Sequence, residues 1–284
     1  MAILSANDPV AFTTVFGISR AGAVWCPINP RNEATENQEL LELFDCQVLL
    51  FQAAFAPLVA LIRDRLPRIG TWVCFDDASV DGALKWEEFL AGGEGLPIPD
   101  GRPRADDVAM IVGTGGTTGR PKGVMLTQLN LETMTALTLM SYPFAGRPTY
   151  LALAPLTHAA GVLCFPVLAL GGHIVVMRTP DIGSFLSAIE RDAVTHTFLP
   201  PTLIYMLLDH DRLDQTDLRS LQCFWYGAAP MSPSRLEQAL ERIGPMAQLF
   251  GQTEAPMMIS TMRPEEHRRP DGSIALERLS DCWR

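Results

Sequence analysis

A loop rich in glycine and threonine is the stretch of this sequence best suited to chemistry. It runs Val112-Gly113-Thr114-Gly115-Gly116-Thr117-Thr118-Gly119-Arg120-Pro121-Lys122-Gly123. Its glycines let the backbone turn tightly and approach a ligand, and consecutive N–H groups in such a turn form a concavity that binds anions. The hydroxyls of Thr117 and Thr118 add hydrogen-bond donors, and Lys122 adds a positive charge. The loop therefore has the donor groups of a phosphate-binding site.

Two familiar phosphate-binding motifs do not fit this loop. A P-loop requires Gly-Lys followed by Ser or Thr, whereas the order here is Pro121-Lys122-Gly123. The dinucleotide fingerprint requires a third glycine where this chain has Thr118. A glycine-rich hairpin without a ligand remains the alternative, although a plain turn does not require this pattern. The apolar strand predicted at 108–111 places the loop at the end of a sheet, where open α/β folds bind ligands.

Three further segments with functional residue types follow predicted strands. His158 lies in the apolar segment 155–161. Tyr226-Gly227-Ala228-Ala229-Pro230 contains small residues that allow a planar ligand to lie against the backbone. Phe250-Gly251-Gln252-Thr253-Glu254 offers an aromatic face, a hydroxyl, and a carboxylate suited to phosphate-bound Mg²⁺. Taken singly, His158 is better explained as a buried or loop histidine and Glu254 as a solvated acid, whereas an ordinary strand-to-helix turn explains residues 226–230 as well as a ligand does.

The composition limits the class of protein. The chain has 284 residues, 48% of them hydrophobic, which suffices for one large domain or two small ones with a sizeable core. The net charge is −10 and the basic residues form no long cluster, so we expect no nucleic-acid partner. Six scattered cysteines without a Cys-x-x-Cys pair favour buried thiols in a reducing, cytoplasmic compartment over a zinc site. The sequence does not indicate an oligomeric state.

One long stretch has to be tested as a membrane segment. Residues 149–177 contain no Asp, Glu, Lys or Arg. Prolines and glycines, among them Pro155, Gly161 and Pro166, divide the stretch into short pieces. A strand, a loop, a helix and a second strand therefore fit better than a membrane span. The N-terminal residues lack the basic region of a signal peptide, so we expect neither a leader nor a transmembrane segment.

Helical and strand patterns alternate along the chain. Helices are predicted after the caps Asp8-Pro9, Thr127 and Ser232-Pro233, and over residues 33–44, 58–66, 162–170, 182–191 and 201–208. Strands are predicted at 24–26, 48–51, 72–75, 108–111, 150–154, 174–177, 197–199, 223–226 and 247–250, with 124–126 pairing back as a hairpin. This alternation predicts an α/β fold with mainly parallel sheets and helices on both faces.

Residues 91–107 interrupt this alternation. They contain four Gly, three Pro and several charged residues. This composition predicts a surface connection, and a subdomain boundary near 92–107 is one interpretation of it.

In this order, the functional segments resemble the AMP-forming acyl-CoA synthetases of the adenylate-forming superfamily. Residues 114–123 resemble the family's Thr-Ser-Gly-Thr-Thr-Gly-x-Pro-Lys-Gly signature, and residues 250–254 resemble its Tyr-Gly-x-Thr-Glu motif. Residues 155–158, 227–230 and 21–30 are similar to further family motifs. The resemblance covers residues 1–274 and implies part of the large N-terminal adenylation domain of these enzymes, incomplete at both ends.

The resemblance also implies roles for single residues. The β- and γ-phosphates of ATP would be bound by Thr114, Gly116, Thr117, Thr118, Gly119 and Lys122. The adenosine and α-phosphate would be bound by Gly227, Ala228, Ala229, Phe250, Gly251, Gln252 and Thr253, with Phe250 stacked on the adenine. The acid would contact His158, Tyr226 and Gly227, and Glu254 would bind Mg²⁺. The catalytic residues would be Lys122, Thr117 and Glu254.

These roles imply a reaction in two steps. A carboxylate attacks the α-phosphorus of ATP and forms acyl-AMP and pyrophosphate, after which coenzyme A displaces AMP. The apolar stretch 162–170 favours a fatty or aryl acid. The alternatives are an ATP-binding remnant without catalysis, a product that binds nothing, and an amino-acid adenylation domain.

The resemblance weakens toward the end of the chain. Gly115 and Phe250 replace the family's Ser and Tyr, and residues 275–284 form an atypical tail. The family's ribose-binding Asp motif and its C-terminal lid domain, with a catalytic lysine, are not found in the sequence. We therefore expect a truncated form in which adenylation is slow and thioester formation fails.

Overall fold

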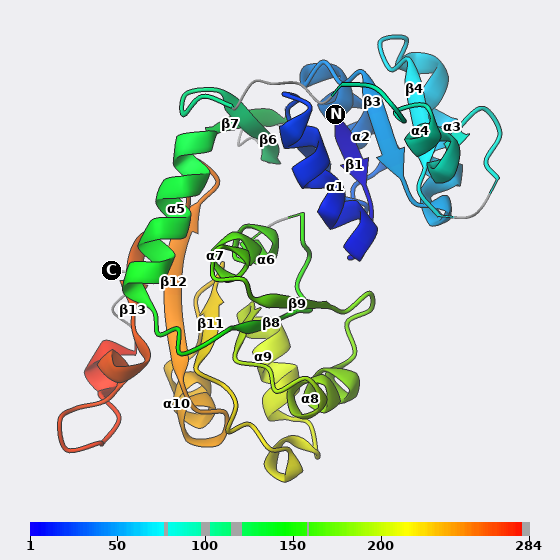
Figure 1. The fold of residues 1–284 in the computed structure, drawn as a ribbon. Helices are drawn as coiled ribbons and strands as arrows, with labels where there is room; N and C mark the ends of the chain where they lie inside the picture. Colours follow the sequence, from blue (N-terminus) through cyan, green and yellow to red (C-terminus); the bar gives the residue numbers. More distant parts are fainter. Residues whose placement is uncertain (77–78, 98–102, 115–120, 158, 280–284) are drawn as a thin grey trace. The chain divides into compact units, whose positions relative to one another are not determined.

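The computed structural model describes residues 1–76, 79–97, 103–114, 121–157 and 159–279 (Figure 1). The chain forms two compact units, Met1–Asn130 and Leu131–Arg284. Each unit has its own mainly parallel sheet and its own buried core. The predicted α/β class is therefore confirmed. Residues 92–107 belong to the first unit, and the domain limits expected from the sequence stay a prediction.

The first unit is built on a parallel sheet of five strands in the order β2-β1-β3-β4-β5. The strands are β1 (Ala2–Leu4), β2 (Cys26–Ile28), β3 (Val48–Phe51), β4 (Thr71–Cys74) and β5 (Leu84–Lys85). The helices between and after them are α1 (Pro9–Arg20), α2 (Ala34–Leu43), α3 (Ala56–Ile62) and α4 (Trp86–Ala91).

Both faces of this sheet are buried. Leu49 and Phe51 of β3 share a cluster with Leu41 of α2 and Ile62 of α3. Leu50 points to the opposite face because side chains alternate along a strand, and it too is buried. Parallel sheets are covered on both faces in this way.

A separate β-hairpin completes the first unit. It consists of β6 (Val108–Thr114) and β7 (Lys122–Thr127), which are antiparallel. Trp25 attaches it to the rest of the unit, because its N–H donates to Ala109 O (3.0 Å) and its carbonyl accepts from Ile111 N (2.9 Å). The predicted return of residues 124–126 is confirmed. The glycine-threonine loop, expected at the end of a sheet, connects the two antiparallel strands of this hairpin and not strands of the five-stranded parallel sheet.

The second unit has a sheet of six strands in the order β13-β12-β11-β10-β8-β9, in which only β13 is antiparallel among the strands described. The strands are β8 (Thr149–Ala152), β9 (His173–Val176), β10 (His196–Leu199), β11 (Cys223–Gly227), β12 (Met246–Gln252) and β13 (Ala255–Met262). The helices are α5 (Gln128–Ser141), which leads in from the first unit, α6 (Ala159–Val162), α7 (Cys164–Ala169), α8 (Ile182–Arg191), α9 (Pro201–Leu208) and α10 (Pro233–Arg242).

The two sheets share one topology. In each, the second strand lies on one side of the first, and the chain then crosses to the other side and adds further strands in order, three in the first unit and four in the second. The first five strands of each sheet thus have the 2-1-3-4-5 order of a doubly wound fold, in which ligands bind at the carboxyl ends of the strands. The order reverses between β1 and β3 in the first unit and between β8 and β10 in the second.

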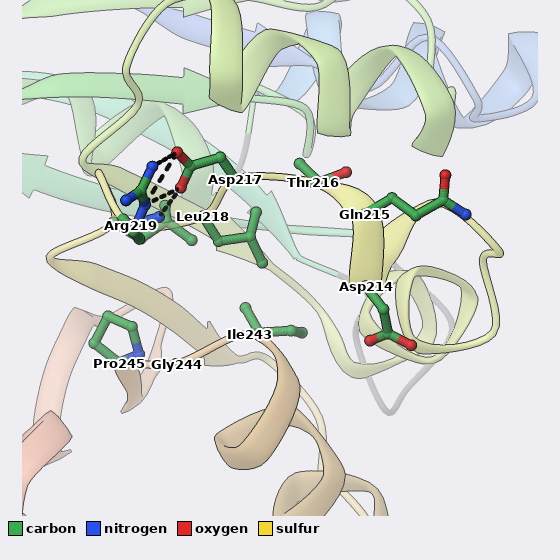
Figure 2. Close-up of a pocket in the computed structure, with 10 residues that line it drawn as sticks. Asp214, Gln215, Thr216, Asp217, Leu218, Arg219, Ile243, Gly244 and Pro245 are labelled. Carbon is green, nitrogen blue, oxygen red and sulfur yellow. Dashed lines mark hydrogen bonds and ion pairs between the residues drawn. The ribbon is translucent and has the colours of Figure 1, made fainter.

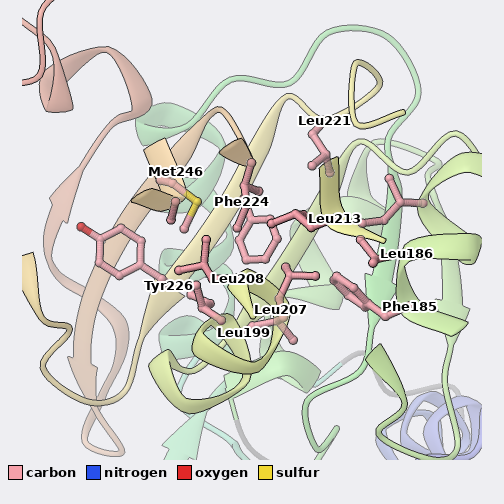
Figure 3. Packing of buried hydrophobic residues seen from close by; sticks show 14 of the residues in the cluster. Phe185, Leu186, Leu199, Leu207, Leu208, Leu213, Leu221, Phe224, Tyr226 and Met246 are labelled. Carbon is pink, nitrogen blue, oxygen red and sulfur yellow. The ribbon is translucent and has the colours of Figure 1, made fainter. Parts of the chain in front are cut away.

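The core of the second unit lies between its sheet and helices α8, α9 and α10 (Figure 3). Helix α8 buries Ile182, Phe185, Leu186 and Ile189, the spacing of one helical face. Phe185 packs edge-on against Phe224 of β11, with ring centroids 6.4 Å apart.

The uncharged stretch 149–177 folds as β8, α6, α7 and β9, so the predicted helix at 162–170 corresponds to α7, and the short helix α6 precedes it. In the described part of the chain, no helix has the length and hydropathy needed to cross a membrane. The five cysteines described are free and buried, as the sequence predicts.

Candidate functional site

The glycine-threonine loop closes the β6–β7 hairpin. Thr114 is the last residue of β6 and pairs with Lys122, the first residue of β7, whose side chain is exposed. Gly115, Gly116, Thr117, Thr118, Gly119 and Arg120 lie outside the described residues. The structure therefore places the two ends of the predicted phosphate loop side by side, and the roles of the loop residues stay predictions.

Two glycines that flank the loop pack the hairpin against helix α2. A Cβ on Gly113 would lie 2.8 Å from Leu40 Cδ2, and a Cβ on Gly123 would lie 2.7 Å from Phe44 Cε1. Gly113 and Gly123 face each other in the ladder. These glycines thus serve the packing of the hairpin within the first unit.

The small-residue segment forms the end of β11 and the turn after it. Gly227 is buried and lies opposite Leu249 of the parallel strand β12. A Cβ on Gly227 would lie 2.2 Å from the backbone oxygen of Leu249, so only glycine fits here. The glycine expected to admit a ligand is therefore required by the approach of β12.

The turn after β11 has an unusual backbone. Ala228 has φ +65°, in the left-handed region that residues with a Cβ rarely adopt, and it is exposed, as are Ala229 and Pro230. Such conformations concentrate at functional sites, where the surrounding structure holds them.

The Thr-Glu segment forms the tight turn between β12 and β13. Gln252 pairs with Ala255, so Thr253 and Glu254 are the two residues of the turn. Glu254 and Gln252 are exposed, whereas Thr253 and Phe250 are partly exposed. Since β11 and β12 are neighbouring parallel strands, their carboxyl ends bring this turn and the Ala228–Ala229 turn to the same edge of the sheet.

Gly251 sits at a bulge in this hairpin. A Cβ there would lie 2.3 Å from the backbone nitrogen of Met257, which itself has φ +65°. The ladder shifts between Phe250 and Gln252, so several residues of β13 lie opposite Gly251. The bulge on β13, which the sequence does not predict, thus accounts for the glycine in this motif.

Of two side chains expected at the acid site, His158 and Tyr226, the structure describes only Tyr226. His158 lies outside the described residues, at the end of the segment that follows β8. Tyr226 is buried (Figure 3). Its hydroxyl lies 2.9 Å from Nε2 of His267. No sequence pattern points to His267, because a lone histidine after a strand carries no spacing signal.

A pocket of about 550 Å³ lies at the opposite edge of the same sheet (Figure 2). Its lining includes Leu221, just before β11, and Pro245, just before β12, so it adjoins the amino ends of these strands. Arg219 donates from Nε to Asp217 Oδ1 (2.9 Å) and lowers the pKa of that carboxyl. This pocket is separate from the candidate site because that site lies at the carboxyl ends.

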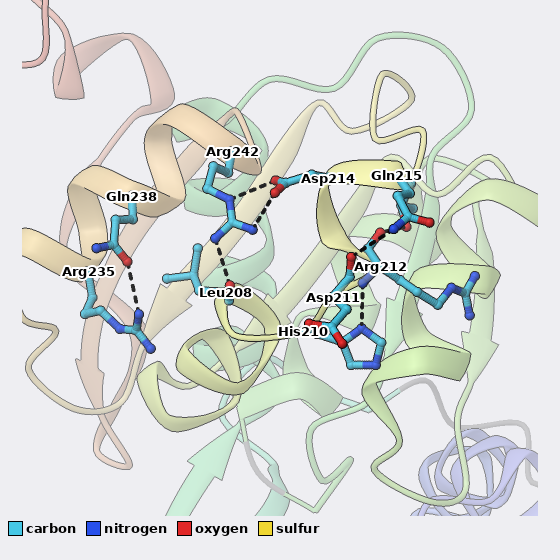
Figure 4. A network of polar contacts seen from close by, with 10 residues as sticks. Leu208, His210, Asp211, Arg212, Asp214, Gln215, Arg235, Gln238 and Arg242 are labelled. Atoms are coloured by element: carbon cyan, nitrogen blue, oxygen red, sulfur yellow. Dashed lines mark hydrogen bonds and ion pairs between the residues drawn. The ribbon is translucent and has the colours of Figure 1, made fainter.

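The polar network beside this pocket fastens helices together (Figure 4). Arg242 of α10 donates from Nε to Asp214 (2.8 Å) and from Nη1 to the carbonyl of Leu208 at the end of α9 (2.8 Å). Arg235 of α10 donates to Gln238 (3.0 Å) and to Asp209 (2.6 Å). The two arginines are thus paired with acceptors on α9, on α10 and on the chain after α9, so we assign the network a structural role.

The carboxylate of Glu254 suits a magnesium ion whose other ligands are mainly phosphate oxygens. Within the described ranges, no group of three or more His, Cys, Asp and Glu side chains could hold a metal by itself. Glu254 offers one exposed carboxylate, and Mg²⁺ is commonly held by one or two carboxylates together with substrate phosphates. The residues therefore suit a metal that arrives with a nucleotide.

Fold and site together define a doubly wound α/β protein with exposed turns at the carboxyl ends of neighbouring parallel strands, the edge at which such folds bind ligands. The sequence profile of the AMP-binding enzymes matches residues 1–276. The chain belongs to this family.

Individual relatives agree with this membership. The chain is 38% identical over 180 residues to a medium/long-chain-fatty-acid–CoA ligase of Mycobacterium tuberculosis, covering 63% of this chain and 30% of that protein. It is 34% identical over 260 residues to a feruloyl-CoA synthase of an Amycolatopsis species, covering 90% of this chain and 49% of that protein. The structure of an amide bond synthetase from Marinactinospora thermotolerans matches with a TM-score of 0.83 at 27% identity, covering 98% of this chain and 54% of that one. This chain thus spans about half the length of these proteins, or less.

Proposed function

We propose that this chain takes part in the ATP-dependent activation of a carboxylic acid, through acyl-AMP to an acyl-CoA thioester. Membership in the AMP-binding family supports the nucleotide part of this proposal. The structural observation that supports this proposal is that the Ala228–Ala229 turn and the Thr253–Glu254 turn lie at the same edge of the sheet. Residues 1–274 would form the adenylation domain, followed by the tail 275–284.

The nucleotide would be held by residues of two kinds. Backbone and hydroxyl donors for the phosphates would come from Thr114, Gly116, Thr117, Thr118, Gly119 and Thr253, with a positive charge from Lys122. The adenosine would lie along Gly227, Ala228, Ala229, Phe250, Gly251 and Gln252. Phe250 would stack on the adenine, because its partly exposed ring offers an aromatic face.

The chemistry requires stabilisation of charge on phosphoryl oxygens. A carboxylate oxygen bonds to the α-phosphorus while the bond to pyrophosphate breaks, and the thiolate of coenzyme A later bonds to the acyl carbon and releases AMP. Lys122, Thr117 and Glu254 would act in the first step, because oriented donors and positive charge stabilise such a transition state. Mg²⁺ bound with the phosphates would neutralise further negative charge, with Glu254 as its protein ligand.

A fatty or aryl acid is the proposed substrate. The names of the relatives, a fatty-acid ligase and a feruloyl-CoA synthase, support both classes. His158, Tyr226 and Gly227 would lie along the acid. Because the side chain of Tyr226 is buried and its hydroxyl is hydrogen-bonded to His267, the contact of Tyr226 with the acid would come from its backbone. The buried thiols favour a cytoplasmic compartment.

Two other functions remain candidates. An ATP-binding remnant would bind Mg-ATP without releasing pyrophosphate, and an amino-acid adenylation domain would release pyrophosphate with amino acids only.

Carboxylate-dependent pyrophosphate release, measured with a panel of fatty, aryl and amino acids, separates these functions. We expect release with a fatty or aryl acid and none without an acid. Mg-ATP binding without release for any acid would reject the enzyme and leave the remnant. Release with amino acids alone would support the adenylation domain.

A further inference from the structure

A buried tyrosine–histidine pair adjoins the turn after β11. Tyr226 directly precedes Gly227, and its hydroxyl lies 2.9 Å from Nε2 of His267. His267 ends the short 3-10 helix Pro264–His267, which follows β13. The side chains are 1% and 0% exposed, respectively.

The hydrogen bonds fix the direction of this contact. His267 Nδ1 lies 2.9 Å from the carbonyl oxygen of Arg263, which can only accept, so Nδ1 carries the proton. Nε2 is then an acceptor, and the hydroxyl of Tyr226 donates to it. Burial lowers the pKa of His267, against smaller opposing effects of backbone hydrogen bonds and Glu266, which keeps the ring neutral as this arrangement requires.

This contact joins β11 to the segment after β13, in addition to the backbone ladders that pair β11 with β12 and β12 with β13. Tyr226 is held next to Gly227 and the strained Ala228. His267 is held by the segment that continues from β13, whose other end is the Thr253–Glu254 turn. Its own carbonyl accepts from Ala275 N (2.9 Å), which anchors the segment further along the chain.

We infer that His267 is a positioning residue for nucleotide binding: through Tyr226 it fixes the Gly227–Ala229 turn relative to the Thr253–Glu254 turn. This inference rests on the proposed function. The rival explanation is a hydrogen bond that only stabilises the core. In that case its loss would lower thermal stability and leave the nucleotide affinity of the folded protein unchanged.

The test compares Tyr226→Phe, His267→Leu, their double variant and His267→Gln, which keeps one donor and one acceptor. Tyr142→Phe is the matched control, because Tyr142 is a buried tyrosine in the same unit whose hydroxyl donates to Gln248 O (2.6 Å). Calorimetric titration with AMP gives affinity, thermal unfolding gives stability, and amide NMR shifts of Ala228 and Glu254 report the turns without ligand.

We expect each single variant to weaken AMP binding about three- to tenfold, the range for one lost hydrogen bond, with the double variant no weaker than either. His267→Gln should restore much of the affinity, and Tyr142→Phe should lower stability alone. Unchanged AMP affinity in Tyr226→Phe and His267→Leu, or equal weakening in Tyr142→Phe, would overturn the positioning role.

Absence of AMP binding by the unaltered chain would instead reject the proposed function. The amide shifts then decide the inference by themselves. Changes at Ala228 and Glu254 in Tyr226→Phe and His267→Leu, but not in Tyr142→Phe, support positioning, and unchanged shifts reject it.

Discussion

Single glycines of the motifs have packing roles in the fold. Gly227 and Gly251 face backbone atoms that leave no room for a Cβ, whereas Gly113 and Gly123 lie against the side chains of Leu40 and Phe44. The backbone shape that presents Ala228 and Glu254 is therefore built into the fold before any ligand binds. A ligand would use turns that packing between strands has already formed.

Replacing Gly227 with alanine should destabilise the second unit. The new Cβ would lie 2.2 Å from the backbone oxygen of Leu249, and backbone cannot move aside as a flexible side chain can. We expect a loss of about 1–3 kcal/mol in the free energy of unfolding, measured with urea. Gly17→Ala in helix α1, where nothing lies within 4 Å of the new Cβ, is the control and should be neutral or stabilising. Equal stability of the two variants would contradict this account of Gly227.

Glu254→Gln tests the magnesium ligand. The amide keeps the size of the side chain and removes its negative charge, so the Mg²⁺ concentration needed for half-maximal ATP binding should rise about tenfold. Glu241→Gln, an exposed glutamate on helix α10, is the control. If both variants require the same Mg²⁺ concentration, Glu254 is not the ligand.

At the scale of elements, two similar helix starts behave differently. Asp8-Pro9 and Ser232-Pro233 both predict an N-cap. The side chain of Asp8 accepts from Val10 N (2.8 Å) and Ala11 N (3.3 Å), whereas that of Ser232 makes no capping bond. Asp8→Ala should therefore cost about 1 kcal/mol of unfolding free energy, and Ser232→Ala much less. Equal costs would show that the difference between these caps has no energetic consequence.

Strand β10 contains an acid-sensitive residue. His196 is fully buried, its Nε2 lies 2.9 Å from Pro143 O, and its ring stacks on Phe144. Burial lowers its pKa from 6.5 to about 4. Between these values the unfolded chain binds a proton that the folded chain excludes, so stability should fall as the pH drops from 6.5 toward 4, by about 3 kcal/mol.

His196→Gln should remove most of this pH dependence, as measured by urea unfolding at a series of pH values. His173→Gln, an exposed position on β9, is the control and should retain it. The buried His267 adds a dependence of the same sign. If His196→Gln loses as much unfolding free energy between pH 6.5 and 4 as the unaltered chain, His196 is not the source of the pH dependence.

At the scale of the whole molecule, much of the fold follows from sequence patterns. The ranges 48–51, 182–191 and 201–208 match β3, α8 and α9, because apolar periodicity and flanking caps or prolines coincide there. β1 and β5 were not predicted, since they are too short to show a period. β13 was missed because Pro256 and the bulge opposite Gly251 obscure its alternation.

The candidate site was predictable only in part. Parallel strand order brings the ends of β11 and β12 together, so motifs placed after predicted strands could be expected to meet. The contact of Tyr226 with His267 spans 41 residues and depends on the path of the chain after β13, which no local pattern specifies.

Calorimetric titration with Mg-ATP shows whether this chain binds the nucleotide through the motif residues. Lys122 and Lys85 are the only lysines in the sequence, which provides a matched pair of variants. The unaltered chain and Lys85→Ala should bind Mg-ATP equally, and Lys122→Ala should bind about tenfold more weakly, because a charged contact to phosphate is lost. A titration of the unaltered chain without heat of binding, or an unchanged affinity in Lys122→Ala, would contradict the account.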